Sequence, residues 1–78
     1  MKYTFIHILI QEIFVEKFLK LSHESDYNFF PAVRTGDSIY FYYRCKLLPQ
    51  QATEERMKEF LRCLIEINSD IFYRIEKV

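Results

Sequence analysis

The residue types in this chain that could do chemistry are two histidines, two cysteines and scattered carboxylates. His7 could serve as a general base or a pH sensor. The sequence predicts no acidic partner or nucleophile beside it, so we expect a packing or hydrogen-bonding role. Asp26, Asp37 and Asp70 fall in predicted turns, where aspartate favours local hydrogen bonds. These residues predict no catalytic centre.

The cysteines, Cys45 and Cys63, lack metal-ligand spacing. We expect free thiols, a buried Cys45 and a partly exposed Cys63, as in a protein of a reducing compartment. Glycine-rich phosphate loops, serine-centred elbows and metal-binding helix motifs are all absent from the sequence. The sequence therefore predicts a protein that is not an enzyme and uses no metal or cofactor.

Composition predicts one packed domain over residues 1–78, since half of the residues are hydrophobic and 18% are aromatic. Eleven basic and eleven acidic residues cancel. A neutral chain has no overall field that attracts nucleic acid or anionic lipid. The apolar stretch 1–10 is short and is followed by charged residues, which argues against a membrane span. We expect a cytoplasmic protein without membrane contact.

The first half of the chain predicts a strand, a helix and a second strand. Residues 3–10 are rich in β-branched and aromatic side chains, which predicts a central strand buried on both faces. From Gln11 to His23 the apolar residues recur at helical spacing. Residues 29–34 predict an edge strand because they contain Pro31. Residues 35–37 contain the only glycine and predict a tight hairpin.

The second half repeats this order. Residues 38–47 predict a long aromatic strand, and Thr53 is a predicted N-cap with acidic residues in the turn after it. The apolar stripe that follows predicts a helix to about Ile67, ended by the polar residues 68–70. Residues 71–76 alternate as a strand does.

The element order predicts an α+β fold: a two-layer ferredoxin-like βαββαβ sandwich, with a four-stranded antiparallel sheet and two helices on one face. Strands one and three should be central. Two alternatives remain at this point. In one, the last segment extends helix two and gives βαββα; in the other, the N-terminal third is one long helix.

Alternation along the strands assigns the two faces of this sheet. The more aliphatic face is predicted to lie under the helices; it comprises Ile6, Ile8, Ile10, Ile39, Phe41, Tyr43, Cys45, Ile71, Tyr73 and Ile75. The opposite face is aromatic with a few cations. Its proposed partner-binding residues are Tyr3, Phe5, His7, Tyr40, Tyr42, Arg44, Phe72 and Arg74.

An aromatic face left uncovered by the helices predicts a contact surface. The first hypothesis is a small non-enzymatic module that docks a protein partner or a second copy, as a regulator or inhibitor of a larger complex. Phage-type anti-defence proteins, including anti-CRISPR proteins, are one candidate class. The alternative is binding of single-stranded RNA by Tyr and Phe stacking with Arg contacts to phosphate.

Overall fold

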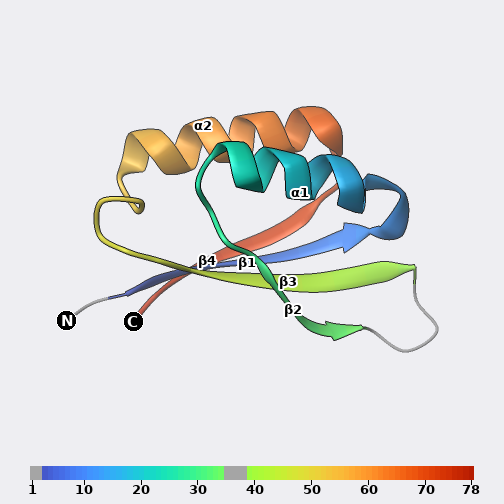
Figure 1. Ribbon diagram of the computed structural model, residues 1–78, viewed down its shortest axis with the longest axis horizontal. Helices are drawn as coiled ribbons and strands as arrows, with labels where there is room; N and C mark the ends of the chain where they lie inside the picture. Colours follow the sequence, from blue (N-terminus) through green and yellow to red (C-terminus); the bar gives the residue numbers. More distant parts are fainter. Residues whose placement is uncertain (1–2, 35–38) are drawn as a thin grey trace.

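The computed structural model describes residues 3–34 and 39–78, which form one sheet with helices packed on it (Figure 1). The predicted hairpin glycine, Gly36, lies outside the described residues. In chain order the elements are β1 (Thr4–Gln11), the 3-10 helix η1 (Glu12–Phe14), α1 (Val15–Glu24), β2 (Phe30–Arg34), β3 (Tyr40–Leu47), α2 (Glu54–Ile67) and β4 (Phe72–Lys77).

The four strands are antiparallel and lie in the order β2-β3-β1-β4. Both helices cover the same side of the sheet, and no element of the described chain lies on its other side (Figure 1). This is the predicted α+β ferredoxin-like βαββαβ sandwich. The alternative in which the last segment extends α2 is wrong, because α2 ends at Ile67 and β4 pairs with β1. One long N-terminal helix is equally excluded by β1.

The boundary between β1 and α1 differs from the prediction. A helix was expected from Gln11, but Gln11 still pairs with Tyr40 in the sheet. The backbone N–H of Glu12 also donates to the carbonyl of Ile39 at 2.7 Å. This extra pairing holds the chain extended, so the α-helix begins only at Val15, after the 3-10 turn.

The core lies between the helices and the aliphatic face of the sheet. Ile6, Ile8 and Ile10 are fully buried there, whereas the other side of β1 is only partly covered, so burial on both faces was predicted wrongly. The ring of Phe18 on α1 packs 5.1 Å from that of Tyr43 on β3, measured between centroids. The other buried apolar residues are Tyr27, Phe29, Cys45, Leu47, Met57, Phe60 and Leu64.

One of these core residues, Tyr27, comes from the connection after α1, where no core residue was expected. Tyr27 is buried against Phe60, and its hydroxyl donates to the carbonyl of Gln51 at 2.7 Å. Asp26 precedes it with a φ of 59°, a left-handed conformation that Asp tolerates better than most residues. This turn directs the Tyr27 ring inward, which no pattern in the sequence indicates.

Two residues predicted to lie under the helices, and one apolar residue of α2, are exposed instead. Ile39 lies just before the first residue of β3, and Tyr73 lies on an edge strand, so neither is covered by a helix. Ile65 lies at the margin of the apolar stripe of α2. The predicted N-cap is confirmed, since the Thr53 hydroxyl accepts the backbone N–H of Arg56 at 3.3 Å.

Candidate functional site

The side of the sheet that the helices leave uncovered, here called the open face, holds every residue proposed from sequence as partner-binding. The register places His7 between Arg44 of β3 and Arg74 of β4. Side chains alternate along each strand, so residues two apart share this face. Among the described residues, the open face comprises Tyr3, Phe5, His7, Leu9, Gln11, Phe30, Tyr40, Tyr42, Arg44, Lys46, Phe72, Arg74, Glu76 and Val78.

At the centre of the open face, His7 joins a hydroxyl to a carboxylate. Its Nε2 lies 2.9 Å from Oε1 of Glu76, and its Nδ1 is hydrogen-bonded to the Tyr42 hydroxyl. With the proton on Nε2, the neutral ring donates to the carboxylate and accepts from Tyr42. The His7 and Tyr42 rings also stack, 5.8 Å between centroids and 13° apart.

These contacts leave His7 only 9% exposed, although no helix covers it. The expectation that His7 has no acidic partner is therefore wrong, because strand β4 brings Glu76 to it. The hydrogen bond from His7 is the largest cause that lowers the pKa of Glu76, and Arg74 and Arg44 lower it further. The carboxylate is thus held in its charged form on the open face.

Two cations of β3 lie over aromatic rings at and just before the start of β1. The guanidinium of Arg44 is 6.0 Å from the centroid of Phe5, and Nζ of Lys46 is 3.8 Å from that of Tyr3. Such cation–π contacts hold the side chains flat against the sheet. Two of the cations of the open face are therefore already in contact with aromatic rings of the same face.

Two exposed phenylalanines lie on the edge strands, one at each side of the open face. Phe30 on β2 is 69% exposed and Phe72 on β4 is 63% exposed. Beside Phe72 a shallow depression of about 170 Å³ is lined by His7, Leu9, Tyr42 and Arg74, among others. The depression is open and mostly apolar, which suits an inserted side chain better than an enclosed small ligand.

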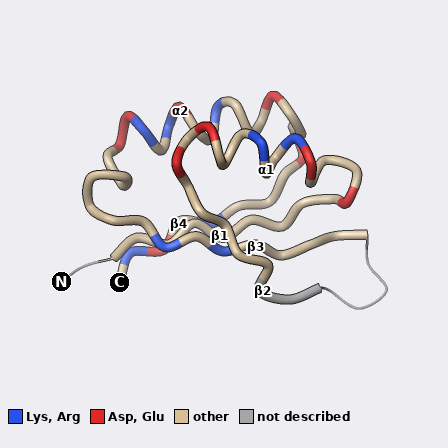
Figure 2. Tube along the Cα trace, in the orientation of Figure 1, with Lys and Arg blue, Asp and Glu red and all other residues tan. Residues whose placement is uncertain are grey.

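Charge is divided between the two layers. Within the bounds of η1, α1 and α2 there are seven glutamates and five basic residues, whereas β1, β3 and β4 carry four basic residues and one glutamate. Figure 2 shows the acidic residues gathered mainly on the helices. Among the described residues of the open face, Arg44, Lys46 and Arg74 against Glu76 give a net charge of 3 − 1 = +2. A neutral chain therefore carries a positive open face.

Sequence reasoning did not propose Lys46 or Phe30 as part of this face. Lys46 shares the alternation of Arg44 and could have been included on that signal alone. Phe30 could not, because its side depends on the pairing of β2, whose register shifts between Pro31 and Val33.

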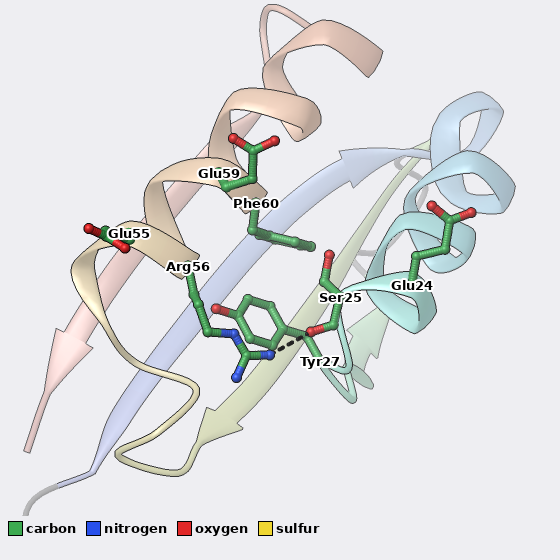
Figure 3. Close-up of a pocket in the computed structure, with 7 residues that line it drawn as sticks. All are labelled: Glu24, Ser25, Tyr27, Glu55, Arg56, Glu59 and Phe60. Atoms are coloured by element: carbon green, nitrogen blue, oxygen red, sulfur yellow. Dashed lines mark hydrogen bonds between the residues drawn. The ribbon is translucent and has the colours of Figure 1, made fainter.

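A second depression, of about 380 Å³, lies on the helix side between the end of α1 and the start of α2 (Figure 3). Arg56 crosses it over the ring of Tyr27 and donates to the carbonyls of Ser25, at 3.1 Å, and Gln50, at 3.2 Å. These contacts tie the loop after α1 to α2. Arg56 therefore has a structural role, and the glutamates around it form a solvated rim.

Chemical groups elsewhere in the described part of the chain give no second site. Over residues 3–34 and 39–78, no group of three or more His, Cys, Asp or Glu side chains could hold a metal ion. Both cysteines are free; Cys45 is buried, as predicted, and burial raises its pKa to about 11. Cys63 is half-exposed, as predicted. Neither described helix has the length and apolar character needed to cross a membrane.

No protein-family model and no curated protein matches this sequence. Solved structures do resemble it. A PII-like protein, CPII, from Thiomonas intermedia K12, bound to ADP, AMP and bicarbonate, has a TM-score of 0.68 at 8% identity, over 100% of this chain and 89% of that one.

Another likeness is to a putative PII-like signalling protein from Thermus thermophilus, with a TM-score of 0.67 at 15% identity, over 100% of this chain and 87% of that one. The de novo designed protein Foldit4 reaches 0.60 at 12% identity, over 99% and 94% of the two chains. A natural signalling protein and an artificial one thus share this architecture, which separates fold from function. These likenesses establish a ferredoxin-like α+β fold for this chain.

Proposed function

We propose that this protein is a non-enzymatic binding module whose open face docks against an acidic surface of a protein partner. The observation that carries the proposal is the combination on one uncovered layer of exposed phenylalanines, three cations and a single, already paired carboxylate. Exposed apolar side chains that gather on one face, rimmed by polar groups, are typical of a contact surface.

The residue types support docking to a protein. Tyrosine and arginine dominate the binding energy of many interfaces, because they bury large areas and still satisfy polar groups. Here the Tyr42 hydroxyl already has its partner in His7, and Arg44 is held over Phe5. Little side-chain entropy would be lost when a partner covers them, which favours affinity. Docking of this kind suits a regulator or inhibitor that occupies a site on a larger complex.

The test uses the protein as bait to capture partner proteins from a lysate of the organism that encodes it. Two charge-reversed variants of the bait are compared with the unaltered chain. Arg44→Glu with Lys46→Glu alters the open face, and Lys17→Glu with Lys20→Glu makes the same charge change on α1. We expect the first variant to lose the proteins that the unaltered chain retains, and the second to keep them. Docking by the open face would be refuted if the retained proteins were lost only with the α1 variant, or if neither variant lost them.

Single-stranded RNA is the second candidate partner, favoured by the net positive charge of the open face. Binding would use Phe30 and Phe72 as stacking rings and the cations as phosphate contacts. The central rings favour it less, because Arg44 and Lys46 lie over Phe5 and Tyr3, where bases would stack.

RNA binding is tested with a labelled single-stranded oligonucleotide at low ionic strength. The RNA hypothesis predicts a fluorescence anisotropy change that falls steeply with added salt and is lost with Arg44→Glu and Lys46→Glu. A flat titration at low salt would remove RNA from consideration and leave the protein partner.

A further inference from the structure

The two edges of the sheet differ in how open they are to another strand. Strand β2 has five residues, includes Pro31, and its register shifts between Pro31 and Val33. Proline and irregular pairing are common devices that block an edge. Strand β4 at the other edge pairs with β1 in one continuous register from Phe72 to Lys77. Only β4 offers a regular outer edge.

The backbone groups that β4 turns outward follow from its pairing with β1. Tyr3 and Val78 exchange both hydrogen bonds, at 3.0 and 2.9 Å. Antiparallel strands alternate between such pairs and pairs without hydrogen bonds. In β4, the even-numbered residues therefore direct their backbone N–H and C=O groups toward β1. The odd-numbered residues Tyr73, Ile75 and Lys77 direct theirs away from β1, toward the open edge of the sheet. These groups are a ready template for a further strand.

We propose that β4 pairs antiparallel with β4 of a second copy of this chain, about a two-fold axis at Ile75. In this register Tyr73 and the partner's Lys77 exchange backbone hydrogen bonds. On the open face, Arg74 lies opposite the partner's Glu76, and the same pair recurs across the axis. Phe72 lies opposite the partner's Val78. The inference goes beyond the proposed function and does not depend on it.

Side-chain charge selects this register from its neighbours. An axis at Arg74 would set two arginines directly opposite each other, and an axis at Glu76 would set two carboxylates opposite. Like charges at such positions destabilise a strand pair, whereas opposite charges stabilise it. Intermediate registers would place open-face residues against residues of the helix side. Of these registers, only the one with its axis at Ile75 places Arg74 opposite the oppositely charged Glu76 of the partner. The same register places the apolar Phe72 opposite the partner's Val78.

The exposed surface at this edge fits the same pairing. Phe72 is 63% exposed and Val78 is 65% exposed, and the dimer would bring these two apolar side chains together. Glu76 uses Oε1 for His7, and a carboxylate has a second oxygen for the partner's Arg74. Because the axis is perpendicular to the sheet, both open faces lie on the same side and form one surface. The outer edges are then the blocked β2 strands, so association stops at the dimer.

A register-specific disulfide tests the proposal. In a Cys63→Ser background, Phe72→Cys with Val78→Cys places thiols directly opposite across the dimer. Within one chain the same positions are roughly 20 Å apart, at about 3.4 Å per residue, too far for a disulfide. We expect a covalent dimer on a non-reducing gel from this pair. The controls are Phe72→Cys alone and Val78→Cys alone, which keep Arg74 and Glu76; in this register each thiol lies roughly 20 Å from the same thiol of the partner, so each should give little covalent dimer. Cross-linking by either single variant equal to that of the pair would overturn the register.

Sedimentation equilibrium tests the dimer itself. We expect the unaltered chain to show twice its mass of 9.6 kDa, Arg74→Glu to show the monomer mass, and Arg74→Glu with Glu76→Arg to recover the dimer. A dimer that survives Arg74→Glu but is lost with Arg44→Glu and Lys46→Glu would overturn edge pairing in favour of contact between open faces. A monomer at all concentrations would also overturn it, and would leave docking of a foreign partner intact.

Discussion

His7 shows how a sheet without a helix over it can still bury a polar side chain. Its two ring nitrogens are satisfied by strands on opposite sides, β3 through Tyr42 and β4 through Glu76. The three side chains thereby fix the relative positions of three strands on the open face. A buried polar group needs such partners, because an unmade hydrogen bond would cost about 1–3 kcal/mol.

The contact between His7 and Glu76 predicts a dependence of stability on pH. The pKa of Glu76 is lowered from 4.5, so the unfolded chain takes up a proton at a higher pH than the folded one. The stabilisation is therefore present above about pH 4.5 and is lost as pH falls through the lowered pKa. Urea unfolding should show a smaller loss of stability toward acid for Glu76→Gln than for the unaltered chain. Parallel pH profiles would contradict this.

The two thiols should differ in reactivity. Burial raises the pKa of Cys45 to about 11 and shields its sulfur, whereas Cys63 lies half-exposed on α2. The thiolate is the reactive form, so Cys45 should be inert in the folded protein. Titration with a thiol reagent at about pH 8 should modify one cysteine per chain, at Cys63, and the second only after denaturant is added. Rapid modification of Cys45 in the native protein would contradict its burial.

At the scale of the elements, α2 is held by three buried side chains of its apolar stripe: Met57, Phe60 and Leu64. Phe60 packs against Tyr27 and Phe29, with ring centroids 4.9 and 5.7 Å away. Phe60→Ala should therefore lower the free energy of unfolding by about 3–5 kcal/mol. The matched control is Ile65→Ala on the same helix, at an exposed position, with an effect within about 0.5 kcal/mol. Similar losses for the two variants would contradict this packing.

The elements were predicted well where a local pattern determines them. Thr53 and the apolar stripe after it predict α2, and alternation predicts β4 and the two faces of the sheet. The start of α1 was misplaced, because the hydrogen bond from Glu12 to Ile39 joins residues far apart in sequence. The burial of Tyr27 and the partner of His7 likewise depend on tertiary contacts, which a single sequence does not specify.

At the scale of the molecule, one layer is helical and the other presents the open face. The acidic side chains lie mainly on the first layer, and the second is positive (Figure 2). A docking partner should therefore approach from the side of the sheet, and edge pairing through β4 would double the surface that it meets.

The most direct test of docking by the open face is site-specific photo-cross-linking in cells of the source. Replacing Phe30 with p-benzoyl-phenylalanine puts the probe on the open face, at a side chain that is already an exposed ring. The same probe at Lys58, exposed on α2, is the control. We predict cross-links to a foreign protein from position 30 and none from position 58. Cross-links from position 58 alone, or none from either position, would contradict the account.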